Sequence, residues 1–213
     1  MCRLLAVHDR RPFDIGSHVR QLAAVARNSR EYQGDGWGCA WLQDGQWRLY
    51  RNLRPVWEDD PDRFGRTTLL LAHARSAFRN EGIDVRNNMP FLTGREAFIF
   101  NGEMRGVRIR AEGRIGAEKL FGLLRRFNGS GEPCGLVKAL EIVKRRTRYI
   151  RAMNFILARP QALYVHACFH EDPEYFTLHK KEAGTQYVIC SEPYPGESGW
   201  TALPNDILEV HPC

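Results

Sequence analysis

The sequence predicts an α+β fold in which antiparallel sheets are covered by helices. Helical spacing is confined to one early segment and two adjacent later ones, and the last third of the chain returns to short strands. Helices in blocks argue against a doubly wound parallel sheet and favour antiparallel sheets. The 213 residues are 43% hydrophobic and 26% charged, which is ordinary for a globular protein. No linker, low-complexity tract or repeat interrupts the chain, so we expect one domain over residues 1–213.

The first third predicts a strand, a helix and a hairpin. Residues 2–8 (CRLLAVH) are an apolar strand beginning almost at the first residue. Residues 17–30 (SHVRQLAAVARNSR) place apolar side chains at helical spacing, and Ser17 is a good N-cap. Residues 38–51 (GCAWLQDGQWRLYR) alternate around Asp44-Gly45, which is typical of a two-residue hairpin.

Buried strands and two helices follow, and then strands again. TTLLLAHAR (67–75) and EAFIFNG (96–102) are short apolar runs that suit buried strands. AEKLFGLLRRF (117–127) and GLVKALEIVKRRTR (135–148) have helical spacing. The strands predicted after them are MNFILAR (153–159), ALYVHACF (162–169), YFTLHK (175–180), QYVICSE (186–192) and DILEVH (206–211).

Composition limits the classes of partner. The formal charge is +6, and the densest basic run, residues 144–151, is typical of a helix end on the surface. A basic balance can also indicate a nucleic-acid-binding module, but no recognised motif of that kind accompanies it, so we expect no nucleic-acid partner. No apolar stretch is long enough for a signal peptide or a membrane span, so we expect a cytoplasmic protein with no membrane partner. The six scattered cysteines are then free thiols.

Cys2 is the one cysteine without an obvious packing reason. Removal of Met1 would leave it with both a thiol and a free α-amine. An α-amine has a pKa near 7.7 to 8.0, so a neutral amine can accept the thiol proton near physiological pH. By itself, a cysteine at position 2 is weak evidence for catalysis and more often an incidental residue.

Three further segments contain residues suited to hydrolysis, each with a plainer alternative. QGDGWGCAW (33–41) is a glycine-rich loop entering a hairpin. Arg75 ends an apolar run, and such an arginine pairs with either a structural carboxylate or a ligand carboxylate. Asn101-Gly102 is either a hairpin turn or a side-chain amide beside an unobstructed backbone N–H, the donor pair of an oxyanion hole.

Taken together and in this order, these motifs resemble the class II glutamine amidotransferases, which are N-terminal-nucleophile hydrolases. The N-terminal Cys, the DGWG loop, the strand ending H-x-R, the N-x-P-F segment and the N-G pair carry the resemblance. It is closest to the stand-alone, single-domain members and runs over nearly the whole chain. It implies a four-layer αββα sandwich with two antiparallel sheets between helix layers.

The resemblance also implies roles for individual residues. Cys2 would be the nucleophile and its own amine the general base, and the side chain of Asn101 and the N–H of Gly102 would form the oxyanion hole. Arg75 would bind the carboxylate of a glutamine-like substrate, and no cofactor or metal is implied. Further residues assigned to the substrate pocket are Gly36, Trp37, His73, Phe78 and Gly116. For His73, a buried structural role is the alternative, and for Trp37 and Trp200 it is a place in the core.

The chain departs from the family at four positions. Phe78 replaces the usual Thr, Met89 and Phe100 replace usual His residues, and Gly116 stands where an Asp commonly binds the substrate ammonium. Losing such a charge-assisted contact costs on the order of 1.5 to 3 kcal/mol, unless Glu112 or Glu118 reaches the ammonium instead. Two interpretations follow: an amidohydrolase acting on glutamine, a γ-glutamyl compound or an amide that lacks an α-ammonium, or a degenerate binding or scaffold protein.

Two further predictions concern metals and partners. His166, Cys168 and His170 alternate along a predicted strand, a spacing that could hold zinc but more often reflects plain packing. No synthase domain follows the hydrolase, so we expect a small-molecule amide substrate and either free-standing hydrolysis or a separate synthase subunit that receives ammonia. The oligomeric state is left open.

Overall fold

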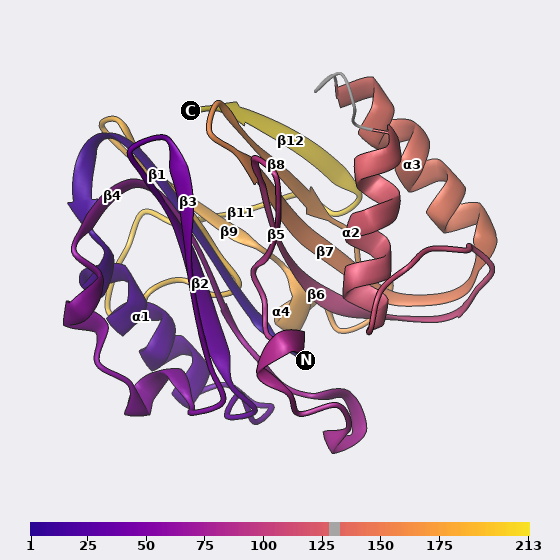
Figure 1. The fold of residues 1–213 in the computed structure, drawn as a ribbon, viewed down its shortest axis with the longest axis horizontal. Coiled ribbons are helices and arrows are strands. Elements are labelled where there is room, and N and C mark those ends of the chain that lie inside the picture. The colour runs from indigo at the N-terminus through magenta and orange to yellow at the C-terminus, as the bar shows by residue number, and fades with distance from the viewer. Residues whose placement is uncertain (128–132) are drawn as a thin grey trace.

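A computed structural model describes residues 1–127 and 133–213 of the chain. Two antiparallel sheets lie face to face, with helices on the outside of each (Figure 1). The helices are α1 (Ile15–Arg27), α2 (Gly116–Phe127), α3 (Pro133–Arg146) and the short α4 (Pro173–Phe176), with 3-10 turns at Val56–Glu58, Pro61–Phe64, Phe78–Asn80 and Val85–Asn87.

The first sheet has seven strands in the described residues, in the order β11-β9-β10-β1-β4-β2-β3. In chain order they are β1 (Arg3–Asp14), β2 (Trp37–Gln43), β3 (Gln46–Asn52), β4 (Arg66–Ala74), β9 (His179–Ala183), β10 (Gln186–Cys190) and β11 (Thr201–Ala202). The predicted hairpin is confirmed, because β2 and β3 pair in register around Asp44-Gly45. β1 lies at the centre between β4 and β10, so the first residues of the chain are held on both sides.

The second sheet has five strands in the described ranges, in the order β12-β8-β7-β6-β5. They are β5 (Phe91–Thr93), β6 (Glu96–Val107), β7 (Thr147–Arg159), β8 (Ala162–Ala167) and β12 (Ile207–Pro212). β5 pairs only with Glu96–Phe98 of β6, so within the described residues the rest of that edge of β6 has no strand beside it. This free edge becomes part of the site described below.

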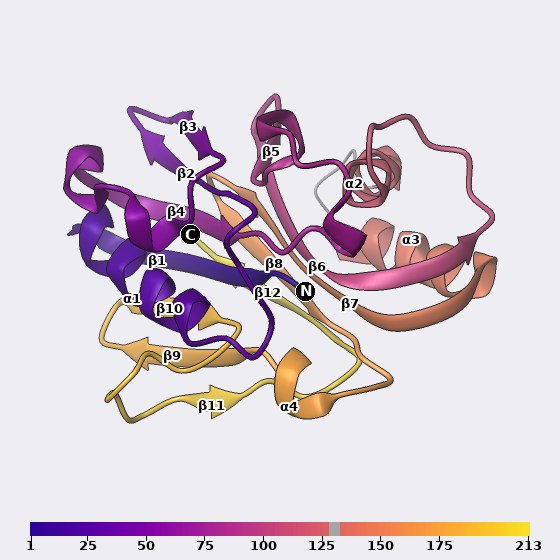
Figure 2. The ribbon, with the colours of Figure 1, turned by 90° about the horizontal axis from the view of Figure 1, so that it is seen from below.

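Side chains that alternate along the strands point into two different hydrophobic cores, one beside α1 and one that includes the space between the sheets. On β1, Leu5 and Val7 pack with α1 residues on the outer face, whereas Leu4 and Ala6 face the second sheet. On the far side of the second sheet, Phe98 of β6 stacks on Phe121 of α2 with 5.0 Å between ring centroids. Figure 2 shows α1 and the α2–α3 pair on opposite outer sides of the two sheets. The predicted four-layer αββα sandwich is therefore confirmed.

Several local predictions were wrong. α1 begins at Ile15, not Ser17, because the Asp14 carboxylate accepts the Ser17 N–H at 2.6 Å and so caps the helix. The strand predicted over 175–180 is instead α4 followed by β9, since Pro173 opens a helical turn there. The helix predicted over 135–148 ends at Arg146 because β7 begins at Thr147, but Lys144, Arg145 and Arg146 do form its last turn, as expected for the basic run.

Membrane crossing by a helix is not supported in the described part of the chain. None of the helices in residues 1–127 and 133–213 combines the length and the apolar character that a membrane span requires.

Candidate active site

Three strands bring the predicted catalytic residues together. Cys2 precedes β1, Arg75 follows β4, and Asn101 lies within β6 of the other sheet. The backbone N–H of Cys2 donates to Asn101 Oδ1 at 2.9 Å, which joins the two sheets at the nucleophile. The Cys2 thiol lies 3.6 Å from the carbonyl oxygen of Ser76, next to Arg75.

Asn101 presents an unused donor at this place. Its side chain is 1% exposed, and because Oδ1 accepts from Cys2, the other amide atom is Nδ2, which has no hydrogen-bond partner. A buried amide donor without a partner is costly unless something else accepts from it. β6 continues through Asn101 to Val107, so the hairpin-turn alternative for Asn101-Gly102 was wrong.

The backbone N–H of Gly102 points to the free edge of β6. Met153 lies opposite Gly102 on β7, and the Met153 N–H donates away from it, to Cys168 O at 2.7 Å. Opposite residues in an antiparallel pair point their amide groups either toward or away from each other, so here both point away. The Gly102 N–H and the Asn101 Nδ2 are therefore two donors beside Cys2, the arrangement of an oxyanion hole.

Gly102 is also required by packing. A Cβ at this position would lie 2.1 Å from the carbonyl oxygen of Ala152 and 2.9 Å from the ring of Phe100. Real Cβ atoms do not approach backbone oxygen so closely, so no side chain fits without a shift of β7. Glycine here serves the close approach of two strands as well as the exposed N–H.

The Cys2 thiol is not activated by its surroundings alone. Burial raises its pKa, and the N-terminal ammonium, the Ser76 backbone and Arg75 only partly oppose that effect. The thiol therefore stays protonated near neutral pH and needs a nearby proton acceptor to become a nucleophile.

Arg75 is a buried cation without a carboxylate partner among the described residues. Its side chain is 6% exposed, and the guanidinium donates to Asn88 Oδ1 at 3.2 Å and to Gly82 O at 2.8 Å. Burial lowers its pKa, although arginine remains charged. Of the two alternatives for Arg75, a structural carboxylate is not what the described residues provide, so the position favours an anionic ligand.

Gly36 holds the backbone of Arg75 and does not itself line the cavity. Gly36 has φ +109°, and its carbonyl accepts the Arg75 N–H at 2.9 Å. A Cβ here would lie 2.2 Å from Asn88 Nδ2 and 2.6 Å from Asn52 O. Asn88 in turn donates to Asn52 O at 2.7 Å, so Gly36 leaves room for the amide that orients Arg75.

His73 is a buried bridge between the sheets. Its Nε2 donates to Phe100 O at 3.2 Å, and its Nδ1 has no partner. Burial is the main reason that its pKa is lowered to about 3, so the ring is neutral at physiological pH. His73 does not line the cavity, which agrees with the structural alternative for this residue.

The residue before Cys2 is held by three side chains. The ammonium of Met1 forms an ion pair with Glu31, and the Met1 carbonyl accepts from Gln33 Nε2 at 2.6 Å and from the hydroxyl of Tyr175. Gln33 also donates to Glu31 O at 2.9 Å, which ties the loop together. None of these three residues was expected to belong to the site.

A cavity of about 960 Å³ opens beside Cys2. It extends between the free edge of β6 and α2. The lining includes Cys2, Arg75, Phe78, Met89, Gly102, Met104, Gly116, Leu120, Leu123 and Val143. Phe78 is 53% exposed at the rim, and a Cβ on Gly116 would meet nothing within 4 Å. The cavity therefore brings the predicted Phe78 and Gly116 to the same space as Cys2.

The structure does not bring the predicted tryptophans to this cavity. Trp37 is buried on the α1 side of the first sheet, and its indole N–H donates to Asp59 at 2.9 Å. Side chains alternate along β2, so the residue after Gly36 points to the outer face. Trp200 packs against Tyr194 near β11.

The zinc candidates do not form a group. β8 ends at Ala167, so the predicted alternation stops before His170, which is exposed while His166 and Cys168 are buried. His166 Nδ1 donates to Ile207 O at 2.8 Å. Among the described residues, no three His, Cys, Asp or Glu side chains are grouped as a metal would need.

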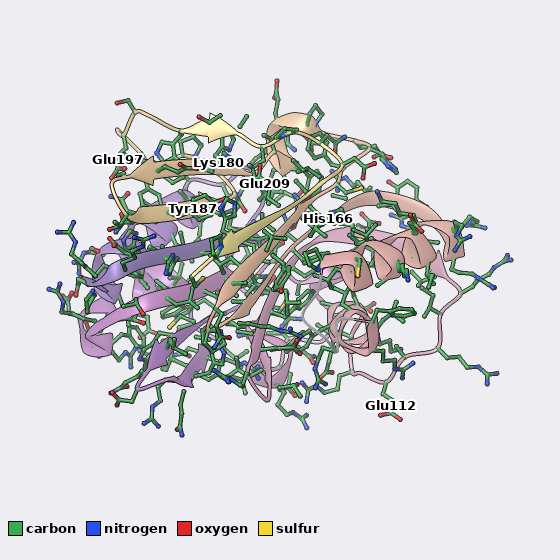
Figure 3. All side chains as sticks on the ribbon, turned by 90° about the horizontal axis from the view of Figure 1, so that it is seen from above. Glu112, His166, Lys180, Tyr187, Glu197 and Glu209 are labelled. Carbon is green, nitrogen blue, oxygen red and sulfur yellow. The ribbon has the colours of Figure 1, made fainter. Side chains whose placement is uncertain are left out.

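A charged pair labelled in Figure 3, Lys180 and Glu209, has a structural role. Lys180 of β9 contacts Glu209 of β12 at 3.4 Å, and Tyr187 lies beside them. This ion pair links β9 of the first sheet to β12, the edge strand of the second sheet.

Sequence reasoning missed Asn88, Glu31, Gln33 and Tyr175. Asn88 belongs to the quoted N-x-P-F segment, so that motif could have indicated it. Glu31 and Gln33 lie just before the DGWG loop, but Tyr175 comes from the far end of the chain, and nothing in its local sequence indicates the contact.

No protein-family model matches the sequence, and no curated protein matches it. The fold is similar to that of solved structures. A class II glutamine amidotransferase domain protein from Silicibacter pomeroyi has a TM-score of 0.68 and 20% identity, covering 98% of this chain and 94% of its own. A predicted glutamine amidotransferase from Pseudomonas aeruginosa has a TM-score of 0.59 and 15% identity, covering 98% and 96%.

A longer enzyme shares the same architecture over part of its length. The glutamine phosphoribosylpyrophosphate amidotransferase from B. subtilis has a TM-score of 0.61 and 14% identity, covering 89% of this chain but 42% of its own. At these identities the likeness concerns the fold. The chain therefore has the fold of the class II glutamine amidotransferase domains, the resemblance that its motifs predicted.

Proposed function

We propose that the chain, once Met1 has been removed, is an amidohydrolase that uses Cys2 to hydrolyse the side-chain amide of glutamine or of a γ-glutamyl compound. The observation that carries this proposal is the contact between Cys2 N and Asn101 Oδ1, which leaves Asn101 Nδ2 buried and unpaired beside the thiol. Most buried asparagines with a structural role pair both amide atoms, as Asn154 on β7 does with Phe176 O and the Cys168 N–H.

The proposed reaction uses groups already close together. The α-amine of Cys2 takes the thiol proton, and the thiolate attacks the amide carbon. The negative charge that develops on the carbonyl oxygen is stabilised by Asn101 Nδ2 and the Gly102 N–H. The ammonium then returns its proton to the leaving nitrogen, which departs as ammonia or an amine and leaves a thioester.

Water completes the cycle. It attacks the thioester carbon, the same two donors stabilise the second oxyanion, and the thiol is released with its proton. Arg75 supplies a buried positive charge that suits the carboxylate of the glutamyl group. Ammonia made in this way would be lost to water unless a separate synthase subunit receives it, so such a partner is part of the proposal. A cytoplasmic location remains a prediction.

The first experiment is intact mass spectrometry before and after incubation with the diazoketone analogue of glutamine, followed by peptide mapping. The expected result is a protein without Met1 and a single adduct on Cys2. A Cys2→Ala variant should give no adduct, whereas Cys134→Ala, which removes an exposed cysteine of α3, should label as the parent does.

The alternative is a binding or scaffold protein that has the same fold. Retained Met1 in protein isolated from its own cell would favour it, because the amine and the nucleophile would then be blocked. A protein that has lost Met1 and still gives no adduct would instead indicate a pocket for a different amide.

A further inference from the structure

Met1 is bound in this structure much as a small ligand would be. Its ammonium pairs with the Glu31 carboxylate, and its carbonyl accepts from Gln33 Nε2 at 2.6 Å and from the Tyr175 hydroxyl. Gln33 is 0% exposed and Tyr175 is buried, so the two donors are part of the framework and not mobile surface groups. The three side chains thus recognise an ammonium and a neighbouring acceptor at the same time.

The donors are held in place by other contacts. Tyr175 packs under Arg3, whose guanidinium carbon lies 4.0 Å from the ring centroid. Burial raises the pKa of Tyr175 to about 12, so its hydroxyl keeps its proton and remains a donor at neutral pH. Gln33 Nε2 also donates to Glu31 O at 2.9 Å, a contact that does not involve Met1.

Glu31 is the carboxylate of the cavity that loses its partner when Met1 leaves. The other described carboxylates lining the cavity are Glu103 and Glu81. Glu103 is paired with Arg105 and lies 3.8 Å from Arg151. Glu81 is exposed near the rim. Glu31, by contrast, is 32% exposed and has Met1 as its ion-pair partner.

The start of α2 offers no free carboxylate to a substrate. Gly116 has no side chain, and Glu118 accepts from the Arg114 backbone N–H at 2.6 Å and pairs with the Arg114 guanidinium at 2.8 Å. Glu112 is exposed and projects from the edge of the molecule in Figure 3. For a positively charged group of a substrate, Glu31 is therefore better placed as a carboxylate partner than Glu112 or Glu118.

We propose that Glu31, Gln33 and Tyr175 form a subsite that binds the ammonium and the adjacent acceptor of an amino-acid or peptide substrate after Met1 has left. This inference rests on the proposed function, because the subsite is vacated by the same processing that frees Cys2. It narrows the substrate class to amides that carry a primary ammonium. The recognition uses one charge-assisted bond and two neutral donors.

The test measures the rate of Cys2 labelling by two diazoketones, the glutamine analogue and its counterpart lacking the α-amino group. The parent protein should label faster with the ammonium-bearing probe. Glu31→Gln keeps the shape of the side chain and removes its charge, so it should slow that probe by about tenfold and leave the other unchanged. Glu81→Gln is the matched control, since it removes a charge from the same cavity and should change neither rate.

Two outcomes would overturn the subsite. Equal effects of Glu31→Gln on both probes would show that Glu31 does not distinguish the ammonium. A changed pH dependence of Cys2 alkylation by iodoacetamide, with no difference between the diazoketones, would show that Glu31 acts on the amine of Cys2 instead. If Cys2 reacts with neither diazoketone in processed protein, the proposed function itself fails and the subsite with it, a result distinct from the first two.

Discussion

The two sides of the cavity are built differently. On the strand side, Cys2, Arg75 and Gly102 line the cavity and Asn101 contacts Cys2, and these residues are held by strand pairing and by hydrogen bonds between buried atoms. The helix side includes Phe78, Gly116 and Lys119, which are exposed and border open space, together with the buried Leu120 and Leu123 of α2.

The two sides should therefore respond differently to substitution. Distances on the strand side are fixed by the sheets, so a small change there disturbs several groups at once. On the helix side nothing contacts the position where a Gly116 side chain would stand, so a change there has few neighbours to disturb. Substitutions should therefore have large effects on the strand side and small ones on the helix side.

The largest effect is expected for Asn101→Ala. It removes the proposed oxyanion donor and the acceptor of the Cys2 N–H, so the rate of ammonia release should fall by about 10²- to 10³-fold. Steady-state kinetics would measure it, with Asn205→Ala as a surface control. A loss below about threefold in folded protein would contradict the oxyanion hole.

Arg75→Met should weaken substrate binding on the same side. Losing a charge-assisted contact to a carboxylate should raise KM by roughly ten- to a hundredfold, with a smaller change in kcat. The exposed Arg79→Met, next to Phe78, is the matched control on the helix side and should change KM little. An unchanged KM in Arg75→Met would show that the guanidinium has only a structural role.

Acid should destabilise the sheets through buried neutral histidines. The pKa values are lowered by burial to about 3 for His73 and about 4 for His18 and His166, below the usual 6.5. The unfolded chain thus binds more protons as pH falls below about 6.5. The free energy of unfolding should drop by about 1.4 kcal/mol per pH unit for each histidine down to its folded pKa.

Urea unfolding at several pH values would measure this dependence. His73→Asn, which removes the histidine of the strand side, should give a shallower slope between pH 6.5 and pH 4 than the parent. A slope equal to that of the parent would mean that His73 is not neutral in the folded protein.

The smallest effect is expected for Gly116→Asp on the helix side. The added side chain meets nothing within 4 Å, and a carboxylate in the first turn of α2 is favourable by about 0.3–1 kcal/mol. The melting temperature should therefore stay the same or rise slightly. A drop of several degrees would show that the space beside Gly116 is filled in solution.

The layers could be predicted from the sequence because their signals are local. Alternation around Asp44-Gly45 and the apolar runs leading to Arg75 and Asn101 placed β2, β3, β4 and β6 correctly. Asp14 was missed as the N-cap because Ser17 has a similar preference, and only the fold shows which one meets the first free N–H groups.

Site residues that belong to a sequence motif could be predicted. Site residues that meet only through the fold could not. Cys2 and Asn101 contact each other as expected. Trp37 was assigned to the pocket by its loop, but strand alternation turns it to the other face. The contacts of Met1 with Tyr175 depend on β1 and α4 meeting across the fold, which no local pattern contains.

The open space at Gly116 has an evolutionary consequence. A glycine codon becomes an aspartate codon through one base change, and the structure offers no steric barrier to that change. One mutation thus interconverts a neutral and an acidic residue at position 116. At Gly102 no side chain fits, because a Cβ there would collide with the carbonyl oxygen of Ala152. A change of substrate through Gly116 would therefore leave Cys2 in place, so the nucleophile would be kept at every step of such an evolutionary path.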